Sequence, residues 1–429
     1  MHPNSAIEKI LGFIKRLVPR RLFRRIQPAY HYTLALLGAL IYRFPSRHIK
    51  VLAITGTKGK TSTTEIVNAI LEEAGYKTAV AGTLRFKVDQ EEERNLYKMT
   101  IPGRFFLQKF LRRAVTAGCD WAVIEMTSEG ARQYRHKWVE LDALIFTNLS
   151  PEHIESHGSF ENYLDAKLSI ARALGASPKR PRIIVANADN EYAGQFLAVP
   201  ADIKTTYTLK DAQPYTLEKD AMTFTFTGAP LSTHLSGAFN LSNILAAVTF
   251  ARTINITPEI IRRALEKFRG IRGRVEHVDV GQDFDVIVDY AHTADSLEKV
   301  YEVFQDSRTI CVLGGTGGGR DAWKRPAMGA IADAHCDEII LTNEDPYDED
   351  PMKIIQEIEA GIKDSEAAVV LDRREAIALA LKKARTGDAV IITGKGTDPY
   401  IMGSHGTKTP WDDATVAREE LEKLGFNKN

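Results

Sequence analysis

Short apolar runs alternate with helical patterns along most of the chain. From residue 49 onward, apolar runs rich in β-branched residues are separated by segments in which an apolar residue recurs every three or four positions. This alternation predicts a parallel sheet with helices between its strands. The first series has expected strands at Val51–Thr55, Trp121–Glu125, Ala143–Thr147 and Ile183–Asn187, and expected helices at Phe105–Ala117 and Phe160–Leu174.

The middle of the chain has a different pattern. Within residues 203–236, apolar side chains alternate with threonines over 222–226, which predicts a short antiparallel excursion. Helical periodicity returns at Asn243–Thr253 and Pro258–Phe268.

A second α/β series begins near Val275, after a glycine-rich stretch at Gly270–Arg274 that we interpret as a hinge. We therefore expect a short basic helical segment over residues 1–48, a central domain over 49–270 and a C-terminal domain over 271–429. The expected strands of the second series are Val286–Asp289, Thr309–Leu313, Glu338–Leu341, Ala367–Leu371 and Ala389–Ile392.

Composition is that of an ordinary globular protein. The 429 residues are 44% hydrophobic and 26% charged, which excludes a disordered or collagen-like chain. Lys plus Arg and Asp plus Glu are both 56, so the net charge of zero argues against a general nucleic-acid binder. The three cysteines, Cys119, Cys311 and Cys336, form no CxxC pair, so we expect neither a zinc ribbon nor a disulfide scaffold. A reducing cytoplasm fits this cysteine usage best.

The charge is concentrated at the N-terminus. Residues 1–50 carry ten Lys or Arg against one acid, Glu8. The apolar run Tyr30–Phe44 is shorter than the about 20 residues that a transmembrane helix needs. One interpretation is an amphipathic helix and a helix packed on the next domain. The other is an interfacial helix attracted to anionic lipid, at the inner membrane surface.

A glycine-rich loop follows the first expected strand and opens a helix. Backbone N–H groups in such a loop cradle phosphates, Lys60 reaches the β- and γ-phosphates, and the Thr61 hydroxyl ligates Mg²⁺. The general pattern has glycine where this chain has Ile54, so the loop is a compact variant. Its residues are Gly56, Thr57, Lys58, Gly59, Lys60, Thr61 and Ser62.

An ordered series of further motifs resembles the Mur ligases, and in particular their MurE type. The loop resembles their ATP loop, and residues Asp289–Thr293 resemble their DYAHTP segment, with Ala294 in place of proline. Folylpolyglutamate synthetases share the ATP loop but not that segment. Further matching segments are Thr147–His153, His157–Gly158, Tyr163–Lys167, Asn187–Asp189, Gly237–Asn243, Gly273–Glu276, Gly314–Pro326 and Gly394–Gly396.

The resemblance implies an α/β fold: a P-loop central domain with a mostly parallel sheet and a C-terminal Rossmann-like domain, preceded here by a short helical segment. It also implies an ATP-dependent amide ligase that uses ATP and Mg²⁺. Such an enzyme adds an amino acid to a UDP-muramyl-peptide-like carboxylate through an acyl phosphate, in peptidoglycan precursor synthesis. Phosphoryl transfer needs cations around the spreading negative charge, so the lysine and Mg²⁺ of the loop fit that chemistry.

The resemblance assigns catalytic roles to Lys60, Glu125, His153 and Lys167. It makes Thr61, Glu125, His153 and a carbamylated Lys167 the metal ligands. From the residues alone, Glu125 ends a strand beside the nucleotide loop, where it either holds a metal or caps a helix. Lys167 lies in mid-helix among apolar residues, where an unmodified lysine usually extends to the surface. The role of His157 stays open between catalytic and structural.

Two further groups of residues follow from the same resemblance. Closure of the two domains over the nucleotide would complete its site. The additional ATP-binding residues are Asn240, Asn243, Arg274, Asp289 and His292. The substrate-binding residues are Thr100, Arg325, Asp345, Tyr347, Gly394 and Asp398.

The chain departs from the MurE pattern at two places that bear on substrate. Tyr347 stands where diaminopimelate-adding members have an arginine for the distal carboxylate, and Asp345, Asp348, Glu349 and Asp350 surround it with acids. An acidic pocket favours lysine or ornithine, unless these acids are simply solvated loop residues. Only about 48 residues precede the ATP strand, so we expect an altered grip on the UDP end, with the basic segment contacting diphosphate or membrane.

Three alternatives remain open at this point. The acceptor is lipid-linked or another polyamide rather than UDP-linked. The chain is a catalytically silent ATP-binding protein, although the joint presence of Lys60, Thr61, Glu125, His153 and Lys167 speaks against that. It is a membrane-surface module that uses the ligase fold as a carrier.

Overall fold

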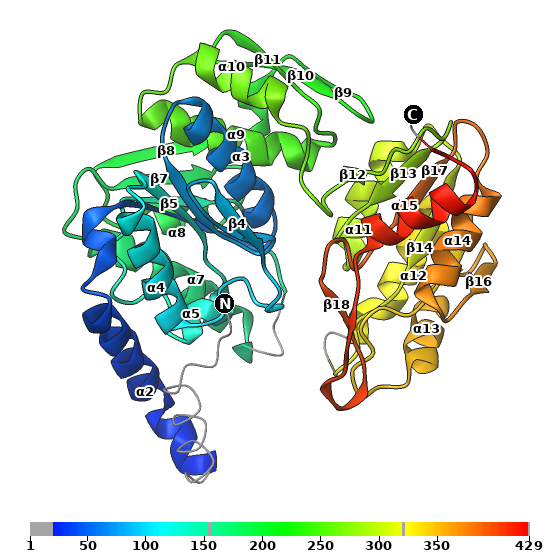
Figure 1. The fold of residues 1–429 in the computed structure, drawn as a ribbon, viewed down its shortest axis with the longest axis horizontal. Coiled ribbons are helices and arrows are strands. Elements are labelled where there is room, and N and C mark those ends of the chain that lie inside the picture. Colours follow the sequence, from blue (N-terminus) through cyan, green and yellow to red (C-terminus); the bar gives the residue numbers. More distant parts are fainter. Residues whose placement is uncertain (1–19, 153–156, 320–321, 428–429) are drawn as a thin grey trace. The chain divides into compact units, whose positions relative to one another are not determined.

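The computed structural model describes residues 20–152, 157–319 and 322–427, and these form two compact units (Figure 1). The first unit contains the chain up to Gln213, together with Thr225–Ala229 and Ser242–Lys267. The second contains Pro214–Phe224, Pro230–Leu241 and the chain from Phe268 onward. Both units are α/β, which confirms the predicted fold class.

The first unit is built on an eight-stranded sheet with the order β4-β3-β2-β5-β1-β6-β7-β8. Strands β2, β5, β1, β6, β7 and β8 are parallel, whereas β3 and β4 extend the edge by antiparallel pairing. The strands are β1 Lys50–Thr55, β2 Thr78–Ala81, β3 Arg85–Val88, β4 Glu91–Arg94, β5 Trp121–Glu125, β6 Ala143–Phe146, β7 Ile183–Asn187 and β8 Ile203–Tyr207.

The four strands predicted for this sheet are confirmed because each is an apolar run buried throughout. The antiparallel prediction for residues 203–236 is wrong at its start. Ile203–Tyr207 is β8 and pairs in parallel with β7 at the sheet edge. The antiparallel excursion begins later, as a three-stranded sheet of β9 Tyr215–Leu217, β10 Met222–Phe226 and β11 Ala229–Thr233.

Helices cover the sheet because alternate strand residues face opposite sides. Val51 and Ala53 of β1 join a core with Leu107 and Phe110 of α4, and Leu52 is fully buried as well. The helices are α2 Arg20–Ile41, α3 Lys60–Glu73, α4 Arg104–Thr116, α5 Ser128–Arg132, α7 Phe160–Gly175, α8 Ala193–Leu197, α9 Ala238–Thr253 and α10 Pro258–Lys267, with short 3₁₀ turns at Pro45–His48 and Leu209–Ala212.

Helix α2 packs on α4 by one side only. Leu34, Ala35 and Ala39 are buried there, whereas Leu37, Leu40 and Ile41 on the other side are 43%, 51% and 54% exposed. Within the residues that the structure describes, no helix combines the length and hydropathy needed to span a bilayer. The exposed apolar side chains therefore form a stripe along the second half of a surface helix.

The second unit has a six-stranded sheet with the order β12-β13-β17-β14-β15-β16, parallel except for β12. Its strands are β12 Glu276–His277, β13 Asp285–Val288, β14 Thr309–Leu313, β15 Glu338–Leu341, β16 Ala367–Val369 and β17 Ala389–Ile392, with a hairpin of β18 Tyr400–Met402 and β19 Lys408–Pro410. Its helices are α11 Ala294–Tyr301, α12 Arg325–His335, α13 Pro351–Glu359, α14 Arg373–Lys383 and α15 Asp413–Lys423, with 3₁₀ turns at Glu302–Phe304, Ala322–Lys324 and Ser404–Gly406.

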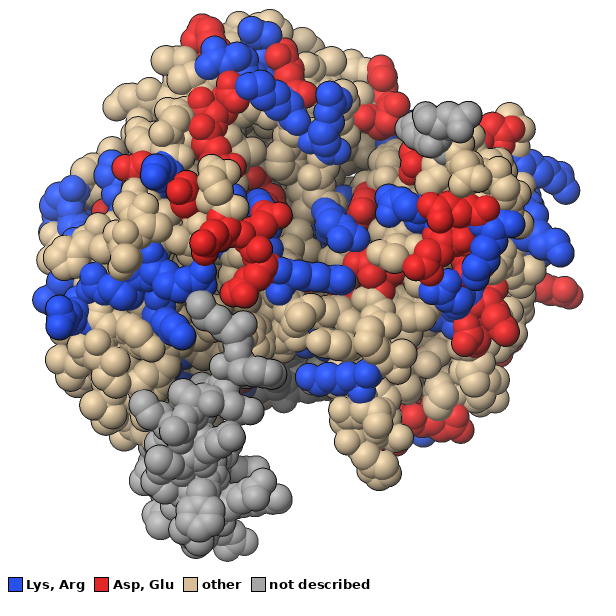
Figure 2. Space-filling model, viewed as in Figure 1, with Lys and Arg blue, Asp and Glu red and all other residues tan. Residues whose placement is uncertain are grey.

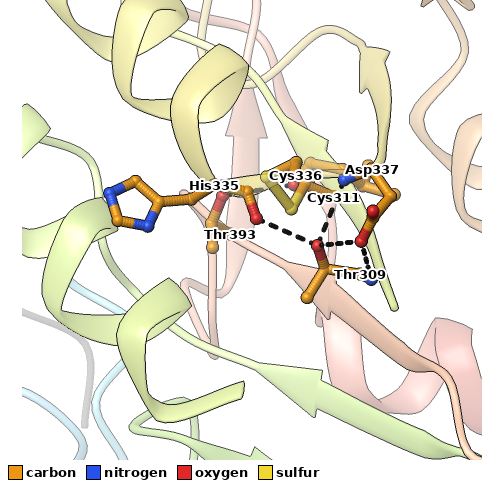
Figure 3. The surroundings of a disulfide bond; sticks show 7 residues. Thr309, Cys311, His335, Cys336, Asp337 and Thr393 are labelled. Carbon is orange, nitrogen blue, oxygen red and sulfur yellow. Dashed lines mark hydrogen bonds between the residues drawn. A yellow bond between two sulfur atoms is a disulfide. The ribbon is translucent and has the colours of Figure 1, made fainter. Parts of the chain in front are cut away.

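One disulfide lies inside the second unit. Cys311 of β14 and Cys336, which follows α12, are bonded with an S–S distance of 2.07 Å (Figure 3). Beside it, Thr309 donates to the His335 carbonyl and exchanges hydrogen bonds with Asp337. This disulfide does not fit the expectation of a reducing environment. It forms where a strand and a helix end come together, which brings two cysteines 25 residues apart in sequence into contact.

Charged side chains of both signs are interspersed over the surface in view, and Lys and Arg gather over α4 (Figure 2). A fully buried ion pair lies inside the second unit. Arg373 at the start of α14 and Asp413 at the start of α15 are both fully buried and pair through two bonds of 2.8 and 2.7 Å. Arg373 also donates to the Thr393 carbonyl at 2.7 Å, so this pair joins two helices to the end of β17.

Arg373→Ala should lower the free energy of unfolding by about 3–5 kcal/mol, because it leaves the Asp413 carboxylate buried without its cation. Lys299→Ala is the matched control, since its pair with Asp295 on α11 is about half exposed, at 48% and 53%. It should cost less than about 1 kcal/mol. Urea unfolding followed by circular dichroism compares the two, and equal losses would contradict the prediction.

Candidate active site

The nucleotide loop joins β1 to α3, and two glycines give it its shape. Gly56 and Gly59 have φ values of +156° and +78°, which disfavour other residues. A Cβ on Gly56 would lie 1.9 Å from Thr147 Oγ1, and one on Gly59 would lie 2.1 Å from Asn243 Oδ1. The loop therefore packs directly on the end of β6 and on α9, which confirms a position beside the loop for Asn243.

The residues after β6 hold the loop in place. Asn148 accepts from the Thr57 N–H at 2.8 Å through its carbonyl and from the Lys58 N–H at 2.9 Å through its side chain. Thr147 Oγ1 donates to the Lys58 carbonyl at 2.7 Å. These bonds hold the backbone of the loop against the segment after β6, so Thr147 and Asn148 act as its clamp.

Two lysines converge on one carbonyl of the loop. Lys60 Nζ donates to the Gly56 and Thr57 carbonyls at 2.9 and 2.7 Å, and Lys167 Nζ donates to the same Gly56 carbonyl at 2.6 Å. Two ammonium groups this close repel each other, so the arrangement attracts anions. A nucleotide phosphate at the N-terminus of α3 is the ligand that such a loop accommodates.

Lys167 is fully buried on α7. Burial, together with the nearby Lys60 cation, holds the pKa of the Lys167 ammonium well below its usual value, and buried Glu152 opposes that shift. Its Nζ also lies 4.8 Å above the ring of Tyr163, whose hydroxyl is 2.9 Å from Thr57 Oγ1. A lysine that is easily deprotonated is a nucleophilic amine, which is the form that reacts with carbon dioxide.

Glu125 is the last residue of β5 and lies beside the loop, as predicted. Strand β5 pairs in parallel with β1, the strand that leads into the loop. Its carboxylate accepts from Thr61 Oγ1 at 3.1 Å and from the Thr83 N–H and hydroxyl, each at 2.9 Å. Thr83 Oγ1 in turn lies 3.0 Å from Thr100 Oγ1. The predicted acceptor contact Thr100 is therefore one residue removed from the carboxylate. Burial raises the pKa of Glu125.

The donor set beside α3 fits Mg²⁺. This hard cation takes oxygen ligands and is usually held by one or two carboxylates plus substrate phosphates. The Thr61 hydroxyl and the buried Glu125 carboxylate provide such oxygens at the phosphate loop. Nowhere in the described ranges do three His, Cys, Asp or Glu side chains gather as a metal site. The predicted ligand His153 lies outside the described residues.

A pocket at the carboxyl end of β5 is lined by two residues, Arg135 and His136, that the sequence analysis did not name as candidates. Glu125, Thr127, Arg135 and His136 line it among apolar neighbours. His136 is 3% exposed, and neither of its ring nitrogens has a hydrogen-bond partner. Burial lowers the pKa of His136 to about 3.

Arg135 makes this pocket suitable for an anion. Its guanidinium donates to the Ile101 carbonyl and to Gln133 Oε1, but it forms no ion pair with a described acidic residue, and its Nε has no partner. Burial and the neighbouring Arg104 cation lower the pKa of Arg135 to about 10. A half-buried guanidinium that pairs with no described acid fits a carboxylate of a substrate. No periodicity marks these residues, because they follow α5 in an irregular segment.

The other predicted nucleotide contacts lie in the second unit. Asp289 is buried at the end of β13 and accepts from the Val275 and Ala291 N–H groups at 2.8 and 2.6 Å. Burial raises the pKa of Asp289 despite the nearby Arg274 cation. Arg274 stacks on the Tyr290 ring at 4.5 Å, and His292 Nδ1 lies 2.8 Å from the Tyr290 carbonyl. Asn240 is buried and donates to the Ser236 carbonyl.

The predicted acidic pocket is largely neutralised within the second unit. Lys395, fully buried, pairs with Asp345 at 2.9 Å and with Asp398 at 3.0 Å. Asp348 accepts from the His405 N–H, and Asp350 caps α13. The partners of Asp345 and Asp348 are 50 and 57 residues away along the chain, so local sequence does not reveal them.

Arg325 is engaged as well. It is 3% exposed and pairs with Glu349 at 2.8 Å and with Glu357 at 2.5 Å, so it is not an unpaired cation awaiting a carboxylate. Glu344 differs from these acids: it is 3% exposed, and its Oε2 has no partner. A Cβ on Gly394 would lie 2.6 Å from that oxygen.

Tyr347 occupies a loop position held by backbone bonds. Its φ is +53°, and its N–H donates to the Met402 carbonyl at 3.0 Å, which ties the loop to the β18–β19 hairpin. The backbone conformation is thus set independently of the side chain. The phenol at this position cannot make the two-bond pair of an arginine with a carboxylate.

These arrangements define a nucleotide-dependent group-transfer enzyme: a phosphate loop with a lysine, a buried carboxylate at a cation position and an anion pocket beside it. Comparison with known proteins agrees. Residues 54–251 match the Mur ligase middle domain, and residues 273–396 match the Mur ligase glutamate ligase domain. The chain therefore belongs to the Mur ligase family. It is an ATP-dependent ligase that forms a C–N bond.

Relatives place it with the MurE type. A UDP-N-acetylmuramoyl-L-alanyl-D-glutamate--2,6-diaminopimelate ligase from Syntrophomonas wolfei is 37% identical over 409 residues, covering 92% of this chain and 82% of that protein. A UDP-N-acetylmuramyl-tripeptide synthetase from Roseiflexus sp. is 36% identical over 428 residues, covering 93% and 84%. The predicted family, its MurE type and its place in peptidoglycan precursor synthesis are confirmed.

Solved structures show the same fold. One UDP-N-acetylmuramoyl-L-alanyl-D-glutamate--2,6-diaminopimelate ligase superimposes with a TM-score of 0.61 at 26% identity, covering 88% of this chain and 79% of that one. The folylpolyglutamate synthase of Mycobacterium tuberculosis, complexed with ADP and AMPPCP, gives a TM-score of 0.67 at 15% identity, covering 91% and 95%. At that identity the second likeness concerns the fold alone.

His136 should make the protein less stable in acid. Its pKa is about 3 in the folded chain and near 6.5 when unfolded, so between these values the unfolded chain binds more protons. Stability contributed by neutral His136 is therefore full above about pH 6.5 and is lost as the pH falls toward 3. Urea unfolding at pH 7.5 and pH 5 measures the loss. His136→Gln should reduce it, whereas His234→Gln, at an exposed histidine, should not; equal losses in both would contradict this assignment.

Proposed function

We propose that this enzyme ligates an amino acid to the terminal carboxylate of a UDP-muramyl-dipeptide-like acceptor, with ATP as phosphoryl donor and Mg²⁺ as cofactor. The observation that carries the proposal is the convergence of Lys60, Lys167 and the Glu125–Thr61 pair on one phosphate loop. The printed names of the relatives, which are diaminopimelate ligases and a tripeptide synthetase acting on muramyl peptides, support the acceptor class.

The chemistry divides into two steps. A carboxylate oxygen of the acceptor attacks the γ-phosphorus of ATP, and ADP leaves with the bridging oxygen. The amine nitrogen of the amino acid then attacks the acyl carbon, the C–O bond to phosphate breaks, and the amine loses a proton. Lys60 stabilises the charge that spreads over the transferred phosphoryl group. Mg²⁺, held by Thr61 and Glu125, would neutralise the charge on the β- and γ-phosphates.

We propose that the acceptor carboxylate binds in the pocket beside Glu125. Arg135 offers a half-buried guanidinium without a described counter-ion, and His136 offers ring nitrogens without partners. Because Thr127 and Glu125 line the same pocket, a carboxylate bound there lies close to the phosphate loop. This proximity lets the pocket orient the attacking oxygen and exclude water from the acyl phosphate.

We propose that the amino acid carries a side-chain amine and no distal carboxylate, as lysine and ornithine do. Tyr347 cannot pair with a distal carboxylate, and the nearby cations Arg325 and Lys395 already pair with acids. The remaining buried acceptor without a partner is Glu344 Oε2, which suits an ammonium group. The proposal thus rests on a charge count in this loop cluster rather than on the names of the relatives.

Phosphate release with Mg-ATP and UDP-muramyl dipeptide tests both the ligase and the amine. We expect release that depends on lysine or ornithine and is at least about tenfold slower with diaminopimelate, since losing one charge-paired contact costs about 1.4 kcal/mol or more. Lys60→Ala serves as the inactive control. No release with any amine would contradict the acceptor, and a preference for diaminopimelate would contradict the role given to Tyr347.

Tyr347→Arg isolates that role. The backbone of Tyr347 is fixed by the hairpin, so the substitution changes chiefly the side chain. We expect KM for diaminopimelate to fall while KM for lysine rises, because the new guanidinium binds a distal carboxylate and repels an ammonium. The exposed Tyr215→Arg is the matched control. The same KM ratio in wild type and Tyr347→Arg would contradict this prediction.

We further propose that Lys167 is carbamylated in the active enzyme. Its neutral amine forms an N–C bond to carbon dioxide and releases one proton, which turns a buried neutral group into an anion beside Lys60 and the predicted metal site. Lys167→Ala should lower kcat at least about 100-fold, and Lys167→Glu should restore part of it, because a carboxylate keeps the negative charge. Equal kcat in the two variants would contradict carbamylation. Lys109→Ala, exposed on α4, is the control.

For location, we propose a cytoplasmic enzyme that contacts the inner membrane surface through residues 1–48. Support comes from the exposed stripe of Leu37, Leu40 and Ile41 on α2, together with the basic charge of this segment. Interfacial helices combine these two features.

Co-sedimentation with vesicles that contain anionic phospholipid tests this contact. Replacing Leu37, Leu40 and Ile41 with serine should remove binding, since it removes the apolar side chains that enter the interface. Leu371→Ser, at a leucine equally exposed in the second unit, should leave binding unchanged. Binding that survives the triple substitution would contradict the proposal.

A further inference from the structure

A buried asparagine joins two irregular segments beside the candidate cation site. Asn95 follows β4, is 3% exposed, and donates through Nδ2 to the Gly82 carbonyl at 2.9 Å and to the Met99 carbonyl at 3.0 Å. The Thr100 carbonyl accepts a longer bond of 3.3 Å from the same nitrogen, and Asn95 Oδ1 accepts from the Tyr97 N–H at 3.0 Å. Three carbonyl partners and one N–H partner fix which atom of the amide is the nitrogen.

The first segment is the turn between β2 and β3, which holds the Glu125 carboxylate. Thr83 in this turn donates to Glu125 through its N–H and its hydroxyl, each at 2.9 Å. A Cβ on Gly82 would lie 2.6 Å from Glu125 Oε1, so the turn packs directly on the carboxylate. The backbone N–H of Asn95 donates to the Leu84 carbonyl at 2.9 Å. Asn95 therefore binds the turn on both sides of the threonine that orients Glu125.

The second segment leads toward α4 and contacts both the turn and the acceptor pocket. A hydroxyl has one proton, and Thr83 Oγ1 donates its proton to Glu125, so in the 3.0 Å contact between the two threonine hydroxyls Thr100 is the donor. One residue further along, the Ile101 carbonyl accepts from the Arg135 guanidinium. The amide that binds the Thr100 carbonyl therefore helps to fix the position of the Thr100 hydroxyl.

The second segment depends on such a bond because it has no regular structure of its own. Residues 95–101 form neither helix nor strand, and Lys98 among them has a φ of +49°, a left-handed conformation that is uncommon for a residue with a side chain. An irregular segment lacks the ladder of backbone bonds that keeps a strand in register. Side-chain bonds to backbone groups replace that ladder, and Asn95 supplies them here.

Resting on the proposed function, we propose that Asn95 is a positioning residue of the ligase. It ties the turn to the irregular segment, and thereby holds Thr83 and Thr100 where they orient the Glu125 carboxylate, the oxygen ligand proposed for Mg²⁺. Residues that orient a metal ligand through hydrogen bonds typically change metal affinity or activity about 10–100-fold when they are replaced. The Asn95 side chain bonds only to backbone groups, so it acts through the residues that it holds.

Calorimetric titration of the full chain with ADP, with and without Mg²⁺, measures this role without turnover. In the wild type, Mg²⁺ should tighten ADP binding, because the cation binds the nucleotide phosphates and the carboxylate together. We expect Asn95→Ala to reduce that tightening at least about tenfold and to leave the affinity for ADP without Mg²⁺ unchanged. An undiminished effect of Mg²⁺ in Asn95→Ala, or no effect of Mg²⁺ in the wild type, would overturn the proposal.

Asn68→Ala is the matched control for the loss of a buried amide. Asn68 is 2% exposed in the same unit, and its side chain bonds to Thr78 and Glu72 rather than to the turn. It should lower stability without reducing the effect of Mg²⁺ on ADP binding. Equal reductions of that effect in the two asparagine variants would show a general loss of structure and would overturn the positioning role.

A double-mutant cycle tests whether Asn95 acts through the turn. Thr83→Val removes the hydroxyl that binds Glu125 and keeps the shape of the side chain. If Asn95 works by holding Thr83, Asn95→Ala should reduce the effect of Mg²⁺ much less in the Thr83→Val background than in the wild type. Full additivity of the two losses would overturn the proposal. Asn95→Ser, which keeps one donor at a shorter reach, replaces Asn95→Ala in every comparison if the alanine variant does not fold.

The phosphate-release assay separates this role from the proposed function. Because the irregular segment also carries the carbonyl that binds Arg135, Asn95→Ala should lower kcat and raise KM for the acceptor, while KM for the amino acid keeps its wild-type value. A chain that releases no phosphate with any acceptor, but loses the effect of Mg²⁺ on ADP binding in Asn95→Ala, would contradict the proposed function and support the positioning role. An equal rise in KM for acceptor and amino acid would overturn the positioning role.

Discussion

The Gly56 carbonyl holds the candidate nucleotide site of the first unit together. It accepts hydrogen bonds from the half-buried Lys60 and the fully buried Lys167, and thereby holds two amine side chains together at the start of α3. Two amines this close disfavour each other's charged form and attract an anion, so the site suits a phosphate. The clamp from Thr147 and Asn148 keeps the carbonyl in position. Catalysis by this loop is thus a matter of charge held in place in advance.

Much of this arrangement follows from the sequence. Where a part does not follow from it, there is a physical reason. Buried parallel strands such as β5 were predicted because they are continuous apolar runs, and Glu125 was placed correctly because it ends one of them. Strand β8 was misassigned because it lies at the sheet edge and alternates in burial. The antiparallel strand β4 was missed because its residues are charged.

The same distinction between residues with and without a local sequence pattern applies to the site. Residues in the loop motif and at strand ends were found from local pattern. Arg135 and His136 were missed because they lie in an irregular segment without a sequence pattern. Only the fold of α5 and β5 brings this segment to the pocket. Asp345 was read as a free acid because its partner, Lys395, is distant in sequence. Charged site residues can therefore be located from the sequence, whereas the residues that neutralise them cannot, because they are distant along the chain.

The chain passes between its two units more than once, since residues 214–224 and 230–241 belong to the second unit while α10 returns to the first. During synthesis, the ribosome releases the whole eight-stranded sheet before Asn243, the residue that closes over Gly59. The nucleotide loop is consequently among the last parts of its own unit to be completed. A nascent chain of this enzyme therefore holds a complete sheet before α9 packs against its nucleotide loop.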